Sequence, residues 1–405
     1  MPLPSSSSLA TASTLDRHAD TRTAALSAAE ILGETIQGHA DAVILFASFH
    51  HAAALPEAVE TIRQVLHPNA AIGMTSSGVV GGHEEIESGP CMSVLALRFP
   101  NSRMRAFSFD HNDGPPEVWS RPLVRSRLRP MSPPRGMLVF ADPFSAGSDV
   151  LPARMSLAVP KGTPIVGGLV SGASQPGANV LVCNDRVSNT GAVGILFEGD
   201  IEMETLLSHG CRPIGEPLVV TAADGPLLST LGGVPAVTAV QSITRHLNDD
   251  DRRMFAGSPL IGIATNANKK RYGRNDFLIR PIAAANERAG TLLLTGPIRT
   301  GSTIQLQVRD ATTAQQDLAM ALDLATIDPR PPAASILLTC TGRGHNLFGH
   351  SGHDAGEVQR RLQSPPQAGM IAAAQLAPIG DTPRIHGLGV AAALLRGSQQ
   401  AENTK

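Results

Sequence analysis

Aromatic side chains are scarce in this sequence, which has one Trp, one Tyr and 11 Phe among 405 residues. Proteins that bind single-stranded nucleic acid stack the bases on aromatic rings, so this class of function is disfavoured. The chain also lacks an excess of charge of either sign, because 33 basic and 35 acidic side chains leave a formal net charge of -2. Without a strong positive field, we expect no nucleic-acid partner.

Cysteines are few and widely separated, at Cys91, Cys183, Cys211 and Cys340. None forms a Cys-x-x-Cys pair, so we expect buried, reduced thiols in a cytoplasmic protein. No run of 18 or more apolar residues occurs, and we therefore expect no membrane partner. The Ser-rich N-terminus has neither a basic start nor a continuous apolar stretch, which is atypical of a secretory signal.

Glycine and proline are abundant, at 39 and 31 residues, which favours many short elements joined by tight turns. A pattern recurs three times, starting at Val43, Met137 and Ser335. Each copy reads as a strand, a helix, a Gly-rich second strand and a final strand. The predicted fold class is therefore α/β with mixed α+β character, built of repeated strand-helix-strand-strand modules in mixed sheets and two domains.

The length of 405 residues suits two domains, and the bounds expected for them are those that the family resemblance given below implies. We expect a disordered arm over 1–15, a first domain of two modules over 16–231, a second domain over 232–397 and a tail over 398–405. The connection 110–135 is rich in Pro and Arg, and we expect it to be extended and solvent-exposed. Its arginines could bind an acidic partner or simply be solvated. Within the second domain, 260–308 is expected to contain several strands, followed by a helix over 311–324.

Two sets of motifs occur in a characteristic order. The first half contains Leu45-Phe46-Ala47-Ser48, Thr75-Ser76-Ser77-Gly78, Ala141-Asp142-Pro143-Phe144 and Val166-Gly167-Gly168. The second half contains Cys340-x-Gly342-Arg343-Gly344, Leu347-Phe348-Gly349, His353-Asp354, Pro378-Ile379-Gly380 and His386-Gly387. In this order and composition the chain resembles the FIST family, whose members carry a FIST N-terminal and a FIST C-terminal domain in series.

The resemblance implies a sensory protein that binds a small metabolite, either an amino acid or a carboxylate. Family members are often fused in bacteria to signalling output domains, and a eukaryotic member is an F-box ubiquitin-ligase subunit. We expect this chain to act as a free-standing sensor that signals through a partner protein, without a cofactor. The alternatives are a protein-interaction adaptor or a thiol-dependent enzyme using Cys340 with His353 or His386 as base.

Candidate ligand-binding residues lie at strand ends. Arg343 can hold a carboxylate through two hydrogen bonds, while flanking glycines let backbone N–H groups approach a ligand. The alternative is a tight structural turn with Arg343 on a surface acid. The full candidate set is Cys340, Gly342, Arg343, Gly344, Gln375, His386, Thr75, Ser76, Ser77, Gly167 and Gly168. The last five occupy matching places in two modules, as two halves of a pocket or as twin structural turns.

Three further patterns carry weaker expectations. Gln375 stands where the family usually has Glu, and a neutral amide cannot ion-pair with an ammonium group, so an altered ligand preference is expected. The side chains of His350, His353 and Asp354 could hold a metal, although their spacing matches no zinc motif, and Asp354 alone suits a helix N-cap. The acidic run 83–87 is interpreted as a solvated loop.

Signatures of the common enzyme classes are missing. The sequence contains no Walker loop, no Gly-x-Ser-x-Gly elbow and no dinucleotide-binding Gly-x-Gly-x-x-Gly after a strand. A binding protein is therefore favoured over an enzyme.

Overall fold

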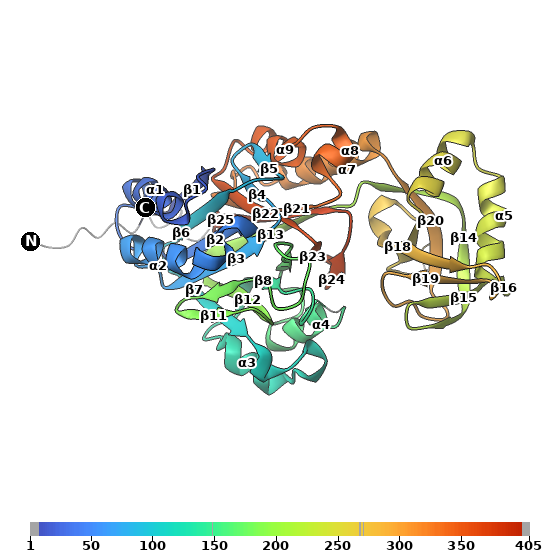
Figure 1. The fold of residues 1–405 in the computed structure, drawn as a ribbon, viewed down its shortest axis with the longest axis horizontal. Coiled ribbons are helices and arrows are strands. Elements are labelled where there is room, and N and C mark those ends of the chain that lie inside the picture. Colours follow the sequence, from blue (N-terminus) through green and yellow to red (C-terminus); the bar gives the residue numbers. More distant parts are fainter. Residues whose placement is uncertain (1–7, 148, 267–268, 270, 399–405) are drawn as a thin grey trace, which may run out of the picture. The chain divides into compact units, whose positions relative to one another are not determined.

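A computed structural model describes residues 8–147, 149–266, 269 and 271–398 of the chain (Figure 1). These residues form two compact units. Unit 1 comprises 1–207, 321–385 and 389–405, and unit 2 comprises 208–320 and 386–388. In sequence terms, unit 2 is therefore an insertion within unit 1. No helix in the described part of the chain is both long and apolar enough to cross a membrane.

The first module of unit 1 begins with a strand and two helices that cover a sheet. Its elements are β1 (Ala10–Asp16), α1 (Thr21–Ile36), β2 (Ala42–Ser48), η1 (Phe49–Ala54), α2 (Leu55–Leu66), β3 (Ala70–Ser76), β4 (Val79–Gly81), β5 (Glu84–Ile86) and β6 (Met92–Arg98). Asp20 caps α1 by accepting a hydrogen bond from the Thr23 backbone N–H at 2.8 Å. Both helices bury an apolar face, which packs on the sheet.

Modules 2 and 3 repeat this order. Module 2 consists of β7 (Ser102–Phe109), η2 (His111–Asp113), η3 (Pro116–Val118), α3 (Arg121–Leu128), β8 (Pro134–Ala141), α4 (Leu151–Met155), η4 (Ser156–Ala158), β9 (Ile165–Leu169), β10 (Leu181–Cys183), β11 (Arg186–Ser188) and β12 (Ala192–Gly199). Module 3 consists of β13 (Ile201–Ser208), α7 (Ala311–Ala325), β21 (Ala334–Cys340), α8 (Gly344–Phe348), α9 (His353–Arg361), β22 (Gln367–Ala372), β23 (Ala374–Ile379), β24 (Thr382–His386) and β25 (Val390–Gly397).

The three modules build three six-stranded sheets of one topology. Read from the same edge, the strand orders are β1-β6-β2-β3-β10-β11, β7-β12-β8-β9-β23-β24 and β13-β25-β21-β22-β4-β5. In each sheet the two strands flanking the helix are parallel, and the module's last strand is antiparallel to them. The predicted repeated modules and mixed sheets are thereby confirmed.

Each sheet is completed by a hairpin that belongs to another module. Hairpin β4–β5 of module 1 pairs with β22, β10–β11 of module 2 pairs with β3, and β23–β24 of module 3 pairs with β9. The exchange therefore runs around a ring, and each module both gives and receives one hairpin. Every sheet of unit 1 depends on two modules.

Equivalent backbone contacts recur in all three modules. At the end of β2, β8 and β21, one residue donates its backbone N–H to the carbonyl oxygen of the residue just before the module's last strand, at 2.8–3.1 Å. These pairs are Ser48–Cys91, Asp142–Gly191 and Cys340–Gly389. The repeat therefore extends to single hydrogen bonds, so positions can be compared between modules.

Each pair of parallel strands has a glycine at the same register position, which we call the glycine rung. These residues are Gly73, Gly167 and Gly369. A Cβ atom added at Gly167 would stand 1.7 Å from the Val139 carbonyl oxygen, and one at Gly369 would stand 1.8 Å from that of Leu337. The backbones at these two rungs are thus too close for any side chain.

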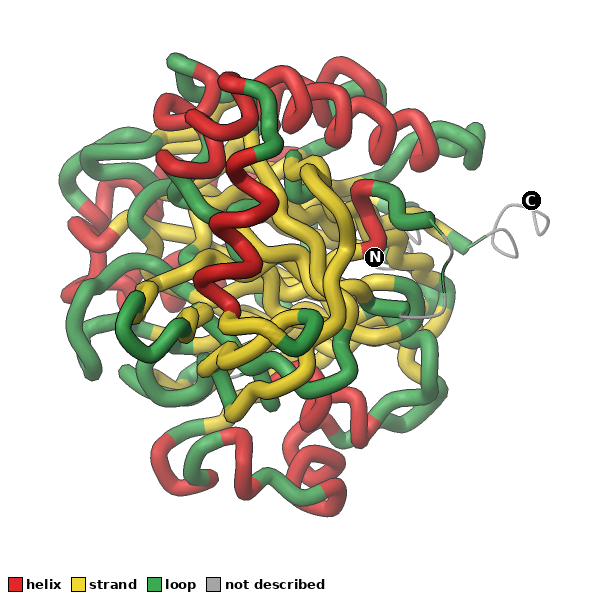
Figure 2. Tube along the Cα trace, turned by 90° about the vertical axis from the view of Figure 1, so that its right-hand side faces the viewer, coloured by secondary structure: helices red, strands yellow, loops and turns green. Residues whose placement is uncertain are grey.

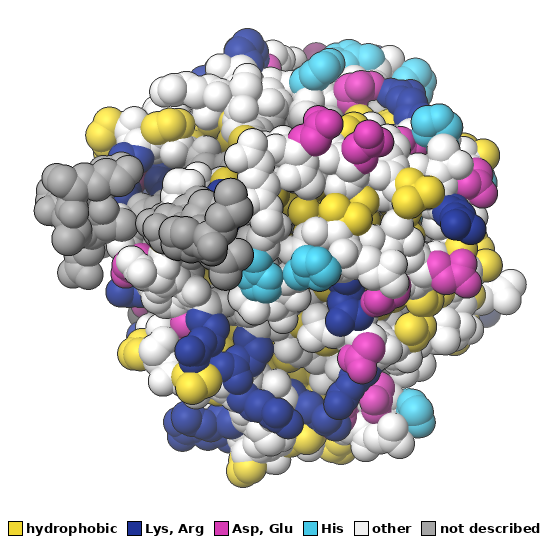
Figure 3. Space-filling model, turned by 90° about the vertical axis from the view of Figure 1, so that its left-hand side faces the viewer, with side chains coloured by type: hydrophobic (Ala, Val, Ile, Leu, Met, Phe, Trp, Pro, Cys, Tyr) yellow, Lys and Arg dark blue, Asp and Glu magenta, His cyan; other side chains and the backbone are white. Residues whose placement is uncertain are grey.

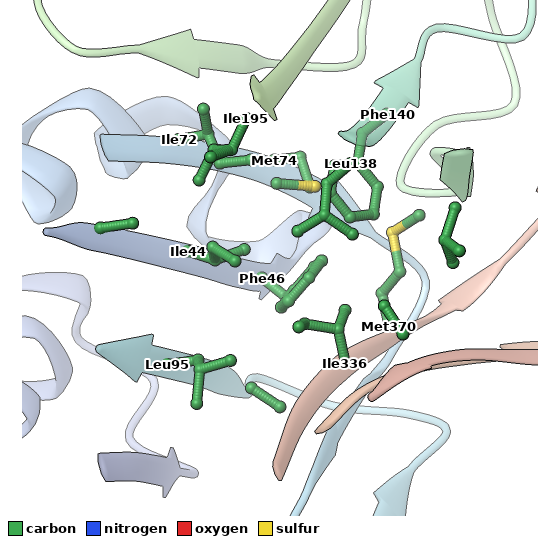
Figure 4. Packing of buried hydrophobic residues seen from close by; sticks show 14 of the residues in the cluster. Ile44, Phe46, Ile72, Met74, Leu95, Leu138, Phe140, Ile195, Ile336 and Met370 are labelled. Atoms are coloured by element: carbon green, nitrogen blue, oxygen red, sulfur yellow. The ribbon is translucent and has the colours of Figure 1, made fainter. Parts of the chain in front are cut away.

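The central core lies between the three sheets (Figure 4). It draws Phe46 from β2, Phe140 from β8, and Ile336 and Met370 from β21 and β22. The rings of Phe46 and Phe140 meet edge-to-face with their centroids 5.4 Å apart. Since all three modules contribute to one apolar cluster, burial couples their stability.

The N-terminal arm is shorter than expected. Strand β1 pairs with β6 from Ala10 to Asp16, so residues 10–15 are part of a sheet rather than disordered. Alternation of small and polar residues conceals this strand in the sequence, because few of its side chains are large and apolar. Residues 1–7 of the expected arm and 399–405 of the expected tail lie outside the described residues.

The connection 110–135 is folded, which corrects the expectation of an extended segment. Helix α3 occupies its centre, with Ser120 as N-cap, and buries Val124 and Leu128 one turn apart. Trp119 is fully buried and stacks on Phe109, with ring centroids 4.0 Å apart. The prolines misled the prediction because one of them, Pro122, occupies the first turn, where a helix tolerates it.

Unit 2 is an antiparallel sheet covered by helices. Its elements are β14 (Cys211–Asp224), β15 (Leu227–Leu231), β16 (Val234–Pro235), α5 (Ala236–Arg245), α6 (Asp249–Gly257), β17 (Leu260–Ala264), η5 (Arg274–Asp276), β18 (Phe277–Asn286), β19 (Thr291–Leu294) and β20 (Thr303–Arg309). The order β14-β20-β17-β18-β19-β15-β16 is closed by an added β14–β15 pairing. Helix α5 packs on these strands and lies before them in Figure 2.

Candidate functional site

A cavity of about 250 Å³ lies in unit 1, between hairpin β4–β5 of module 1 and the segment after β21 of module 3. Its charged and small lining residues are Ser77, Glu85, Glu87, Cys340, Arg343 and Gly344, and Thr339, Thr341, Asn346 and Ile371 complete the wall. The structure thus brings together four predicted site residues, namely Ser77, Cys340, Arg343 and Gly344. We call this space the Arg343 cavity.

Arg343 is held by a carboxylate of the chain itself. Its Nε donates to Asp354 Oδ2 at 2.5 Å and its Nη2 donates to Asp354 Oδ1 at 2.7 Å, with both side chains fully buried. Thr339 Oγ1 donates to the same Oδ2 at 2.9 Å. Burial acts to raise the pKa of Asp354, but the charge of Arg343 and the hydrogen bonds outweigh it and hold that pKa below its usual range.

This ion pair corrects two expectations. The bidentate fork of Arg343 is occupied by Asp354, so it is not available to hold a ligand carboxylate in the predicted way. Of its guanidinium nitrogens, Nη1 is buried without a hydrogen-bond partner among the described residues. Asp354 is not the N-cap of α9 either, because Gly352 occupies that position.

Aromatic rings support the guanidinium from the side. The Arg343 Cζ atom lies 5.3 Å from the centroid of the Phe348 ring, within the range of a cation–π contact. His353 stacks on Phe348 with ring centroids 3.6 Å apart, and its Nδ1 lies 3.0 Å from Asp354 Oδ1. Arg343, Phe348, His353 and Asp354 therefore form one cluster of contacting side chains, in which the Arg343–Asp354 ion pair is fully buried.

Glu85, which the sequence interpretation placed in a solvated loop, is 5% exposed. Its Oε1 accepts the Ala355 backbone N–H at 2.8 Å, and its Oε2 is buried without a hydrogen-bond partner in the described structure. Burial, together with the negative charge of Asp354, raises the pKa of Glu85 to about 7. A group with such a pKa changes its charge near neutral pH.

Glu87 also lines the cavity. Its Oε1 accepts the His345 backbone N–H at 2.9 Å and lies against Gly344, whose φ is +52°. A Cβ at Gly344 would stand 2.1 Å from that oxygen, so a side chain here would be strained by the positive φ and would displace the Glu87 carboxylate. One sequence signal could have found these glutamates: Gly81-Gly82 directly follows the apolar pair Val79-Val80 and precedes the charged run, and a Gly-Gly pair after a short apolar strand is typical of a hairpin turn.

The other predicted residues near the second strands have structural partners. Thr75 Oγ1 accepts the Val180 backbone N–H at 3.0 Å, and Ser76 Oγ donates to the Gly78 carbonyl at 2.7 Å. Gly167 sits on the glycine rung described above. A Cβ atom at Gly168 would stand 2.7 Å from the Ala374 carbonyl oxygen. For these four residues the interpretation as structural turns or strands fits better than that of a second half-pocket.

Gln375 and His386 are both buried, and neither lines the Arg343 cavity. Gln375 lies on β23 in register with Gly168, and His386 belongs to unit 2, where its Nδ1 lies 2.9 Å from His209 Nε2. Gly342 lies between lining residues without lining the cavity itself. The predicted ligand set therefore does not form a single site.

The metal and thiol alternatives find little support. Among the described residues, no group of three or more His, Cys, Asp or Glu side chains is placed to hold a metal ion. His350 Nδ1 contacts the Ser351 carbonyl, and the Nδ1 atoms of the two suggested bases, His353 and His386, contact Asp354 and His209. Cys340 does line the cavity, with 6% of its surface exposed.

Modules 1 and 2 place other residues where module 3 has Arg343. By register, this position is His51 in module 1 and Ser145 in module 2, each six residues after the residue that pairs with the matching glycine of the second strand. His51 Nδ1 contacts Thr21 Oγ1 at 2.9 Å, and Ser145 Oγ donates to Asp142 Oδ2 at 2.7 Å. Of the three equivalent positions, only that in module 3 holds an arginine, and it is the one beside a buried glutamate.

Sequence comparisons assign the whole chain to a family. The FIST N domain matches residues 41–234 and the FIST C domain matches residues 239–378. The chain belongs to the FIST family. FIST domains are associated with sensory signal transduction. Uncharacterized proteins of Mycobacterium tuberculosis strains CDC 1551 and H37Rv, and one of Mycobacterium bovis, are each 31% identical to this FIST protein over 377 residues, which cover 93% of this chain and 96% of the relative.

Proposed function

We propose that this FIST protein senses a small zwitterion of the α-amino acid class, bound in the Arg343 cavity, and signals through a partner protein. The observation that carries the proposal is a pair of buried polar atoms without partners on residues that line one cavity. Arg343 Nη1 can only donate a hydrogen bond, and ionised Glu85 Oε2 can only accept one. A molecule with a carboxylate and an ammonium group satisfies both.

The charge balance of the cavity favours a ligand with an ammonium group. Asp354 neutralises Arg343, so ionised Glu85 and Glu87 leave the lining with negative charge. A simple carboxylate would meet these glutamates without a compensating cation, whereas a zwitterion brings its own. Because buried unpaired polar groups are costly, a ligand that pairs them gains affinity from groups already in place.

The cavity also joins two modules, which offers a route for a signal. Glu85 and Glu87 come from hairpin β4–β5, and Arg343 follows β21. A ligand that bridges them stabilises the pairing of this hairpin with β22. Binding to the folded state alone stabilises a protein by about 2.7 kcal/mol when the ligand is present at 100 times its Kd.

Calorimetry with alanine, propionate and ethylamine, followed by a screen of the other amino acids, tests the proposal. We expect the best amino acid to bind at least about tenfold tighter than either one-charge analogue, since charge-assisted bonds are the strong ones. Its affinity should rise with pH through about 7, because ionised Glu85 pairs with the ammonium group.

Glu85→Gln should weaken amino-acid binding and remove this pH dependence. Glu84→Gln changes the neighbouring, 43% exposed glutamate of the same hairpin and is the matched control. Equal affinity of wild type and Glu85→Gln, or tighter binding of propionate than of any amino acid, would overturn the proposal.

A further inference from the structure

Arginines gather on one surface of module 2, although the chain as a whole carries a net charge of -2. Figure 3 shows Lys and Arg side chains concentrated over the lower part of one face, where α3 lies in Figure 1. Arg121 and Arg125 are exposed on α3, Arg129 is exposed directly after the helix, and Arg103 is exposed on β7, against which α3 packs. Positive charge is thus concentrated rather than evenly spread.

A groove runs along this surface. A hollow of about 400 Å³ is lined by Arg121 and Arg125 together with an apolar wall, and it adjoins a second hollow of about 370 Å³ that shares Arg121. The apolar wall is Pro130, Pro133, Pro134, Ala158, Val159 and Pro160. Met131, 68% exposed, stands at the rim, where its sulfur contacts Arg103 Nη1 at 2.6 Å. We call the two hollows together the α3 groove.

The lining arginines are not neutralised within the chain. Asp113 pairs with Arg127, but among the residues that the structure describes no Asp or Glu lies within ion-pair distance of Arg121 or Arg125. These two residues are one helical turn apart and both face the groove. Two guanidinium groups at this spacing can each take a carboxylate in a bidentate pair.

We propose that the α3 groove docks an extended acidic segment of a partner protein, with its carboxylates on Arg121 and Arg125 and its apolar atoms on the proline wall. Charge complementarity defines this partner, since Arg121 lines both hollows without an acidic partner among the described residues, and the carboxylate in the lining of the second hollow, Asp381, lies 3.8 Å from Lys161 Nζ. A single-stranded nucleic acid is the weaker fit because the lining contains no aromatic ring on which bases stack. The α3 groove shares no lining residue with the Arg343 cavity, so this docking proposal does not rest on the proposed ligand.

Fluorescence anisotropy of a labelled ten-glutamate peptide against the full chain at about 50 mM salt tests this docking, since screening weakens exposed charges at higher salt. We expect saturable binding that Arg121→Glu/Arg125→Glu weakens at least tenfold. Arg288→Glu/Arg299→Glu changes two exposed arginines of unit 2 by the same total charge and should leave binding within twofold. Thermal unfolding midpoints check that all variants fold.

Two further arms distinguish the source of the negative charge. A ten-nucleotide thymidine strand and vesicles containing phosphatidylserine are titrated under the same conditions. The proposal holds if the peptide binds at least several-fold tighter than either and its binding depends on Arg121 and Arg125. It is overturned if the peptide does not bind, if the control variant weakens binding as much, or if the oligonucleotide or the vesicles bind more tightly.

Discussion

Glu85 is the residue whose role differs most from its appearance in the sequence. It stands in a charged run, yet hairpin β4–β5 carries it against α9, where the Ala355 N–H binds one oxygen and the other remains unpaired. The pKa of Glu85 is raised from 4.5 to about 7, mainly by burial. The folded protein therefore holds this proton more tightly than the unfolded chain does.

Replacing Glu85 by Gln should make stability less dependent on pH. Below about pH 4.5 the carboxyl is protonated in both states, whereas above about 7 the folded state has to bury a charge. Wild-type stability should therefore fall between these values relative to Glu85→Gln, by on the order of 2–3 kcal/mol. Thermal unfolding midpoints of both proteins between pH 5 and 8 measure the difference, with Glu84→Gln as control. Parallel pH curves for wild type and Glu85→Gln would contradict it.

Arg343 shows what residue-level prediction could and could not reach. Its motif correctly indicated a position just after a buried strand, and the carboxylate that it binds lies only 11 positions further along the chain. The sequence does not reveal that this pair is buried, because the covering hairpin comes from a segment some 250 residues away in module 1. Breaking such a pair costs about 3–5 kcal/mol. Arg343→Ala should therefore destabilise the fold, and a loss of ligand binding in this variant would not by itself place Arg343 in a binding site.

At the scale of elements, the repeated modules were predictable because each carries a local signal. An apolar strand, a helix and a Gly-rich strand recur at similar spacing, and the strands starting at Val43, Met137 and Ser335 are all present. The hairpin exchange was not predictable. Strands β4 and β10 are three residues long, and nothing local specifies which sheet they join, since pairing is decided by long-range packing.

The close backbone approach at Gly167 and Gly369 predicts that neither glycine can be replaced without a loss of stability. Gly167→Ala and Gly369→Ala each place a methyl group against a carbonyl of the opposite strand, which no side-chain rotation can relieve, and should destabilise unit 1 by at least about 3 kcal/mol. Gly356→Ala, in the open on helix α9, is the matched control and should be neutral or stabilise by up to about 1 kcal/mol. Denaturation midpoints compare the three variants. Similar midpoints would show that the strands can separate at the glycine rungs.

At the scale of the whole molecule, the family domains and the compact units divide the chain differently. The FIST N match ends at residue 234, inside the strands of unit 2, while module 3 of unit 1 extends to β25. A fragment of residues 1–234 would leave β4–β5 without β22, β9 without β23, and the central core without Ile336.

We therefore expect fragment 1–234 to lack a cooperative thermal transition, because burial of its core requires module 3. Fragment 208–320 should fold alone, since the strands from β14 to β20 form a sheet of their own. The β14–β15 pairing closes this sheet around an apolar cluster. Circular dichroism melts and proton–nitrogen NMR spectra of both fragments measure this. A sharp transition and dispersed spectrum for 1–234 would show that the hairpin exchange is dispensable.

The ring of exchanged hairpins has a consequence for how such a chain could arise. Three separate copies of one short module, each lending the same segment to its neighbour, would close into a domain-swapped homotrimer with cyclic symmetry. Unit 1 has that connectivity within a single polypeptide. Copies joined in one polypeptide are free to differ in sequence, so only the junction of modules 1 and 3 has to form the Arg343 cavity and only module 2 has to carry the exposed arginines of α3. Three modules of one connectivity can therefore present three different surfaces.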